Sequence, residues 1–261
     1  MKIVRRAGYL LLGIGIRTLG RLSQGIRIGL ATGFDSGTIV DYVYRNAAHG
    51  TTPLGVWIDR AFLAHPVWQG VRDRRDLLTT ALVRAREHYT APVVFDVAAG
   101  PGSYLFALPV RGELYAGDIS PREVAAGVAR AAAEGRTDIH FSHADAFDSG
   151  TWPVAKPDVL VASGFFDILV DDDEVRRLLD AGTRAAADSA RWVYTVMEQH
   201  TDTDLLRHSL VDLHGEPWKV RLRTAEQVAA MAPHGWRLEG VAREPRGFFA
   251  VATLVRGEAH G

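Results

Sequence analysis

The sequence predicts an α/β protein: a doubly wound, mostly parallel seven-stranded sheet with an antiparallel C-terminal hairpin strand, plus an N-terminal α-helical cap. Apolar segments of strand length alternate with helix-compatible segments from residue 93 onward. Two glycines follow the first of these segments, and acidic residues close the next two. We expect a basic and apolar helical extension over 1–30, a helical cap over 31–90 and the sheet domain over 91–261.

The first predicted strand and the loop after it carry the clearest signal. Residues 93–97 are apolar around Asp96, and Gly100 and Gly102 then force a tight turn before a segment that can begin a helix. Glycines let backbone N–H groups approach a ligand without a Cβ in the way. The first turn of a helix adds unpaired N–H groups and the positive end of its dipole. We therefore expect this loop to hold a polar ligand.

Acidic residues close the next two predicted strands, at Asp118 and Asp145. In an open parallel sheet both lie on one crevice beside the glycine loop, where Asp118 can hold ribose hydroxyls and Asp145 an adenine amino group. Asp145 can equally form an Asx turn or cap a helix. A dinucleotide site needs a third small residue where Leu105 stands. The pattern favours S-adenosylmethionine over a nicotinamide cofactor.

Composition limits the class of protein and its partners. With 261 residues, 47% of them hydrophobic, the chain can bury one sizeable core. A net charge of −1 gives no general attraction to nucleic acid, so we expect none as a partner. The absence of cysteine excludes disulfides and fits a cytoplasmic protein. No apolar run in the sequence approaches the roughly 20 residues that span a bilayer.

Residues 1–30 contain six basic residues and no acidic one. In a helix, Lys2, Arg6, Arg17 and Arg21 would share one face, while residues 9–16 are apolar nearly all round. Three alternatives stay open for this segment: a helix packed on the domain or on a second subunit, a helix on an anionic membrane surface, or a poorly ordered tail. A homodimer and peripheral membrane contact are thus both expectations.

Residues 31–76 mix aromatic, acidic and arginine side chains closely. A helix capped by Asp35 or Ser36 would carry Tyr42, Tyr44 and Arg45. Either these residues are ordinary buried residues of a helical cap, or the cap closes over the cofactor and supplies the substrate pocket. In the second case Asp35, Tyr42, Tyr44 and Arg45 bind the substrate.

Two further segments bear on the site. Residues 218–223 alternate as a strand does, which would place Arg221 and Arg223 on one face. The two arginines either bind an anionic acceptor or merely line a solvated face. The four acids at 171–174 are expected to cap a helix and complement its dipole. We therefore predict no metal site.

These features resemble the class I methyltransferases over about residues 93–255. The strings Gly33-Phe-Asp-Ser-Gly37, Ser163-Gly-Phe-Phe-Asp167 and Gly215-Glu-Pro-Trp218 resemble, more narrowly, a bacterial putative methyltransferase family whose members are sometimes fused to a hydrolase or acyltransferase-like partner. The chain departs from that family's pattern after Thr195. The cofactor contacts that the resemblance implies are Asp96, Ala98, Gly100, Gly102, Asp118, Ile119, Asp145, Ala146, Ser163 and Gly164.

The resemblance implies methyl transfer from S-adenosylmethionine but no substrate. We expect the acceptor to be a small molecule, such as a natural-product or lipid-like intermediate. The alternative is a cofactor-binding protein of the same fold with a non-methylating or non-catalytic role. Methyl transfer needs alignment, desolvation and, for an O–H or C–H acceptor, removal of a proton. We favour His200 as the base because an imidazole pKa suits a base near neutrality. Phe166 offers an aromatic face to the sulfonium or substrate. The other candidate bases are Glu198, Tyr44, Asp35 and Asp167.

Overall fold

The computed structural model describes residues 13–200, 210–212 and 214–257. The chain divides into two compact units. The helical unit takes residues 1–72 and 200–220, and the sheet unit takes residues 73–199 and 221–261. The boundary after Arg72 falls inside helix α5 (Pro66–Glu87). Residues 200–220 thus join the N-terminal part of the chain from a distance in sequence.

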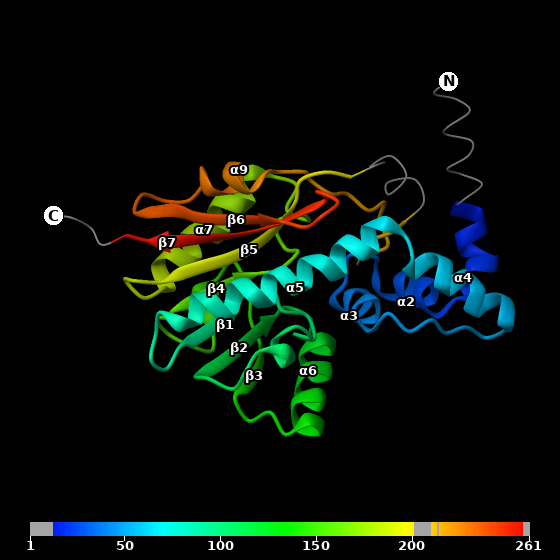
Figure 1. The fold of residues 1–261 in the computed structure, drawn as a ribbon, viewed down its shortest axis with the longest axis horizontal. Coiled ribbons are helices and arrows are strands. Elements are labelled where there is room, and N and C mark those ends of the chain that lie inside the picture. Colours follow the sequence, from blue (N-terminus) through cyan, green and yellow to red (C-terminus); the bar gives the residue numbers. More distant parts are fainter. Residues whose placement is uncertain (1–12, 201–209, 213, 258–261) are drawn as a thin grey trace. The chain divides into compact units, whose positions relative to one another are not determined.

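A seven-stranded sheet forms the centre of the sheet unit (Figure 1). Its order is β3-β2-β1-β4-β5-β7-β6, with β7 antiparallel to both of its neighbours and the other pairs parallel. This confirms the predicted doubly wound sheet and its C-terminal hairpin. The strands are β1 Val93–Asp96, β2 Glu113–Asp118, β3 Ile139–His143, β4 Val159–Ala162, β5 Arg191–Met197, β6 Trp236–Arg243 and β7 Phe249–Arg256.

Helices cover both faces of this sheet because alternate strand residues point to opposite sides. On β4, Val159 and Val161 pack in one cluster with residues of α5, while Leu160 and Ala162 pack in another with residues of α7 (Asp172–Ala185) and α9 (Ala225–Ala229). Helix α6 (Pro121–Glu134) lies along β2 and β3 (Figure 1). All four β4 residues are buried, which explains why this strand reads as a continuous apolar run.

The segment after the glycine loop differs from the prediction of a helix start. It forms only a single 3₁₀ turn, η2 (Leu105–Ala107), and Leu108 is already extended. Pro109 lacks an N–H group and disfavours helical backbone in the residue before it. The prediction that an α-helix begins directly after this loop, and that its first turn adds N–H groups to the ligand site, is therefore wrong.

From residue 19 onward, four short elements and the first turns of α5 make up the N-terminal part of the helical unit. Ser36 caps α3, as one of the two predicted caps, and Thr52 caps α4. The elements are η1 Leu19–Leu22, α2 Gln24–Thr32, α3 Gly37–Arg45 and α4 Pro53–Leu63.

One buried carboxylate joins these helices. Asp59 of α4 has no exposed surface, and it accepts hydrogen bonds from the hydroxyl of Ser23 (2.5 Å) and the backbone N–H groups of Gly25 (2.7 Å) and His49 (2.8 Å). The hydroxyl of Tyr42 also donates to it. Four donors on three different segments thus bond to one carboxylate. A buried carboxylate needs such partners, because an unpaired charge inside a protein is strongly destabilising.

The predicted N-terminal extension is described from residue 13 onward; residues 1–12 lie outside the described residues. Residues 13–17 are helical, and the chain then turns through η1 before Ser23 caps α2. Arg17 and Arg21 therefore do not lie on one continuous helix. Within the described residues, no helix combines the length and the apolar character needed to cross a membrane.

Candidate active site at the carboxyl edge of the sheet

The carboxyl ends of β1, β2 and β4 bring the predicted cofactor residues to one edge of the sheet. Asp96 at the end of β1 lies in register with Ala116 of β2 and Val161 of β4. The glycine loop, Asp118 and Ser163 follow these three positions directly. The strand order reverses between β1 and β4, which is where open α/β sheets form their ligand crevice.

The glycine loop is tied to the end of β2 by Asp118. Its carboxylate accepts hydrogen bonds from the backbone N–H groups of Gly100 and Ser120, both at 2.8 Å. Gly100 and Gly102 have φ values of 55° and 62°, the left-handed region that favours glycine. The N–H group of Gly100, expected to face a ligand, is thus used by Asp118. Burial raises the pKa of Asp118 even though these two hydrogen bonds oppose the shift.

Asp96 lies beneath the same loop and is fully buried. It accepts hydrogen bonds from the Tyr104 hydroxyl and from the backbone N–H group of Ala98 (3.1 Å). Burial raises the pKa of Asp96 to about 7, and the charge of Asp118 adds to the shift. Asp96 therefore supports the loop from below and titrates close to neutral pH.

Asp96→Asn is expected to remove part of the pH dependence of stability. An aspartate in an unfolded chain has a pKa of about 3.9, so between that value and about 7 the native protein holds more protons at this site than the unfolded chain does. The free energy of unfolding then falls as pH rises, by up to about 1.4 kcal/mol per pH unit from this group. Urea unfolding at about pH 5 and about pH 8 should show the variant gaining on the wild type at the higher pH. A constant difference would contradict the assignment.

The adenine-side candidates lie at the ends of β2 and β3. Asp145 forms the Asx turn weighed from the sequence, since its side chain accepts from the N–H group of Phe147 at 2.8 Å. Ala146 is buried, whereas the side chain of Ile119 is 58% exposed beside Asp118. An exposed isoleucine at this position offers an apolar surface to a flat ring.

The string Ser163–Asp167 contacts the segment 218–223 in the loop after β4. Asp167 is buried, accepts from the N–H group of Met197, and lies 3.7 Å from Arg74. Its backbone carbonyl accepts from the N–H group of Arg221 at 2.9 Å. Burial raises the pKa of Asp167 to about 6, although the nearby arginine charges oppose the shift. At the start of the same loop, the N–H group of Gly164 donates to the Thr195 hydroxyl at 2.7 Å.

Arg223 holds this loop in place, and all of its N–H groups bond to protein acceptors, so none is available to bind a substrate. Its side chain is 3% exposed, and its five N–H groups are used by the Asp172 carboxylate and the carbonyls of Phe166, Leu169 and Val170. Residues 218–223 do not form the expected strand, and Arg221 is exposed while Arg223 is buried. The prediction that the two arginines lie on one face is therefore wrong.

The acids at 171–174 do what the sequence indicates for a helix start. Asp171 caps α7, and together with Glu174 it forms a capping box. Asp172 and Asp173 also lie in the first turn, where the helix dipole favours negative charge.

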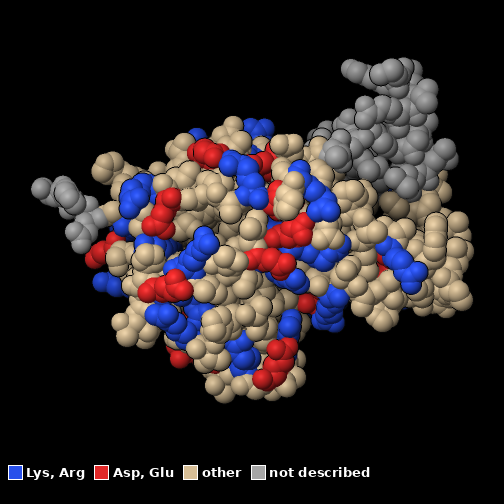
Figure 2. Space-filling model, in the orientation of Figure 1, with Lys and Arg blue, Asp and Glu red and all other residues tan. Residues whose placement is uncertain are grey.

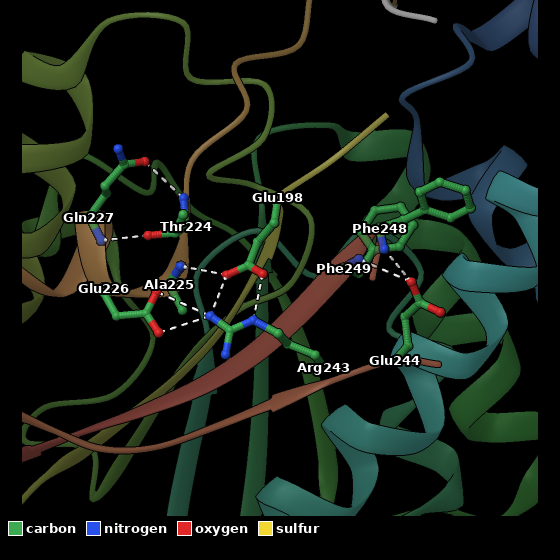
Figure 3. Close-up of polar contacts among 9 residues, drawn as sticks. All are labelled: Glu198, Thr224, Ala225, Glu226, Gln227, Arg243, Glu244, Phe248 and Phe249. Atoms are coloured by element: carbon green, nitrogen blue, oxygen red, sulfur yellow. Dashed lines mark hydrogen bonds and ion pairs between the residues drawn. The ribbon is translucent and has the colours of Figure 1, made fainter. Parts of the chain in front are cut away.

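Glu198, which directly follows β5, is bound by Arg243 at the end of β6 (Figure 3). Arg243 donates to both of its carboxylate oxygens, at 2.7 and 3.0 Å, and the N–H group of Ala225 donates to one of them at 3.0 Å. Arg243 also pairs with Glu226. Figure 3 shows a second carboxylate, that of Glu244, accepting from the N–H groups at the start of β7. Both glutamates have structural contacts.

The remaining predicted residues lie in different surroundings. Phe166 is buried and packs edge-to-face on Tyr194, with ring centroids 5.5 Å apart. Tyr42 is buried against Asp59, which gives it a structural contact as well. In the helical unit, Arg45 is exposed and pairs with Asp41, and Tyr44 and Asp35 are half-buried. His200, directly after β5, is also half-buried.

Nearly the whole chain matches one protein-family model. The family is described as "Putative methyltransferase", and the match covers residues 2–256. The chain belongs to this family. The prediction drawn from the sequence strings is thereby confirmed at the level of the family.

A curated relative and two solved structures resemble this family member over most of its length. YnbC of Escherichia coli K12, an uncharacterized protein, is 27% identical over 256 residues; the match covers 92% of this chain but 43% of YnbC, so the chain spans less than half of that relative. A possible exported protein from Bordetella parapertussis has a TM-score of 0.65 at 19% identity, covering 98% and 97% of the two chains. Magnesium protoporphyrin IX methyltransferase from Synechocystis, solved with S-adenosylhomocysteine, has a TM-score of 0.59 at 15% identity, covering 87% and 97%. The fold is thus that of class I methyltransferases.

Two residues of this site, Arg74 and Tyr104, carry no signal in the sequence. Arg74 is one of several arginines in a charged stretch of α5, and nothing in its spacing separates it from the exposed ones. Tyr104 looks like an ordinary apolar residue after the glycine loop. Only the folded structure brings Arg74 to Asp167 and Tyr104 to Asp96.

Proposed function

We propose that this protein is an S-adenosylmethionine-dependent methyltransferase acting on a small molecule. The observation that carries the proposal is the Asp118 carboxylate at the end of β2, bonded to the glycine loop at the point where the strand order reverses. A carboxylate in this place suits the paired hydroxyls of a ribose. Membership of a methyltransferase family supports the reaction type.

The residues at this edge fit such a cofactor. Asp118 would hold the ribose, and the exposed Ile119 would pack on the adenine. Ser163 and Gly164, which follow β4, would lie toward the amino-acid end. S-adenosylmethionine bound there would supply a methyl group activated by its positively charged sulfur.

The chain's own residues align the acceptor and take up its proton. Among the candidate bases, Glu198 is bound by Arg243, and Asp167 is buried within the loop after β4. His200, half-buried directly after β5, is the base that we propose for an acceptor whose proton must be removed. Asp35, Tyr44, Arg45 and Arg221 remain our candidates for contacts with the acceptor.

His200→Ala is expected to slow turnover about a hundredfold, because a positioned base contributes at least that much to proton removal. Affinity for S-adenosylmethionine should stay unchanged in calorimetry. His140→Ala is the matched control, since His140 is an exposed histidine paired with Glu113. An unaltered rate in His200→Ala would remove this residue from the mechanism.

A small-molecule acceptor is supported by the distribution of charge. On the face shown in Figure 2, basic and acidic side chains are interspersed over the sheet unit. That face offers no continuous basic track of the kind that follows a phosphate backbone. The net charge of −1 agrees with this.

Calorimetric titration with S-adenosylmethionine, S-adenosylhomocysteine and NADH tests the cofactor. We expect binding of the first two at micromolar concentration and none of NADH. Transfer of a labelled methyl group to fractions of a small-molecule extract, followed by mass spectrometry, then tests the reaction. Binding of NADH in place of the adenosyl compounds would overturn the proposal.

A further inference from the structure

Two buried arginines lie beside the loop after β4, and they differ in how their guanidinium groups are used. Arg223 donates all of its N–H groups to protein acceptors. Arg74 is 5% exposed, yet among the described residues it has no hydrogen bond, and its Nε is sealed from solvent without a partner. Within the described residues, its guanidinium lies near one carboxylate, that of Asp167, 3.7 Å from Nη1, and one aromatic ring, that of Phe249, 5.0 Å away.

This arrangement leaves the Arg74 charge poorly compensated. A buried guanidinium is stabilised by short, paired hydrogen bonds to a carboxylate, and 3.7 Å is beyond hydrogen-bond reach. Asp167 faces Arg74 with one oxygen, Oδ2, because its other oxygen, Oδ1, accepts from the N–H group of Met197. A second carboxylate would give Arg74 the partners that it lacks.

The position of Arg74 relates it to the proposed cofactor site. A Cβ added to Gly164 would lie 3.2 Å from Nη1, so the guanidinium reaches the backbone at the carboxyl end of β4. Gly164 has a φ of 72° and its N–H group is fixed by Thr195. The absence of a side chain at Gly164 thus leaves the guanidinium in direct contact with the loop backbone.

The strand order sets the direction of the ligand. Asp118 is on β2, and β1 and then β4 follow it across the sheet. With neighbouring strands about 4.8 Å apart, β4 lies roughly 10 Å from β2. If the ribose is at Asp118, the amino-acid chain of the cofactor extends toward β1 and β4, where Arg74 supplies a positive charge.

We propose that Arg74 binds the α-carboxylate of the adenosyl cofactor. This inference rests on the proposed function and assigns the amino-acid end of the same site. It makes Arg74 a binding residue that selects ligands carrying the intact amino acid.

Calorimetry with S-adenosylmethionine and decarboxylated S-adenosylmethionine tests the proposal, because the two probes differ only in the carboxylate. In the wild type we expect the intact probe to bind at least tenfold more tightly. Arg74→Met should lower affinity for the intact probe at least tenfold and leave the decarboxylated probe within about twofold. Arg74→Lys should recover part of the loss, since it restores the charge without the planar fork.

Asp167→Asn separates this role from a structural one. The variant keeps an oxygen that can accept from Met197 and removes the charge nearest to Arg74. If Arg74 serves the ligand carboxylate, this variant should bind S-adenosylmethionine as tightly as the wild type or more so. If Arg74 only supports Asp167, both variants should weaken the two probes alike, and the proposal is overturned.

The remaining outcomes are also decisive. If the wild type binds neither probe, the proposed function fails, and this inference fails with it. If the wild type binds both probes equally and Arg74→Met changes only the Michaelis constant for an acidic acceptor, the carboxylate belongs to the acceptor and the proposal is overturned.

Discussion

Replacing Asp118 with alanine is expected to lower the affinity for S-adenosylmethionine at least a hundredfold. The change removes the proposed acceptor of the ribose hydroxyls and also releases the N–H groups of Gly100 and Ser120. Hydrogen bonds to a charged group are each worth about 1.5–3 kcal/mol, so the loss of two suffices for this effect. Isothermal titration calorimetry measures the affinity directly.

Asp148→Ala is the matched control for this experiment. Asp148 is an exposed aspartate that caps a short 3₁₀ turn, so the chemical change is the same but lies outside the proposed site. Its affinity should equal that of the wild type. Retained affinity in Asp118→Ala, with unchanged circular dichroism, would reject the cofactor site.

Replacing Asp59 with alanine is expected to have the largest effect on stability, lowering the free energy of unfolding by about 3–5 kcal/mol. Four donors on separate segments of the helical unit would lose their common acceptor inside the protein. Each buried donor left unpaired costs about 1–3 kcal/mol. Urea unfolding followed by circular dichroism measures the loss.

Two milder variants place this result on a scale. Tyr42→Phe removes one of the four donors and leaves the carboxylate bonded to the other three, so a smaller loss is expected. Asp76→Ala removes an exposed aspartate paired with Arg75 and should cost less than about 1 kcal/mol. A loss in Asp59→Ala no larger than that of Asp76→Ala would show that this carboxylate does not organise the helices.

The sheet could be predicted from the sequence because its signals are local. Apolar runs and the glycine pair mark the strands and the loop, and the break at Pro245-Arg246-Gly247 marks the hairpin between β6 and β7. The prediction of a helix start after Gly102 is wrong because composition alone does not show where the helical backbone stops. Pro109 disfavours helical backbone in Leu108, so the segment ends after a single 3₁₀ turn. Residues 218–223 alternate, but their N–H groups bond to separate acceptors, such as the carbonyls of Leu210, Asp167 and Met197, and not to successive residues of one neighbouring strand.

Side-chain roles were harder to predict because partners come from distant parts of the chain. Glu198 resembles a base at a strand end until Arg243, 45 residues later, pairs with it. Arg223 resembles an anion-binding residue in the sequence, but in the structure its N–H groups donate to acceptors on the segment 166–172. The position of Asp118 could be foreseen, since the end of a strand is set by the fold itself.

The contacts of Arg223 bear on how a ligand would enter. Because its guanidinium binds carbonyls along residues 166–170, we expect the loop after β4 to keep one conformation before anything binds. A ligand that contacts this loop would then spend little entropy on ordering it, which favours tight capture of a ligand of matching shape. The same rigidity would limit the range of acceptors that the loop tolerates, so broad substrate tolerance would have to come from other segments of the chain.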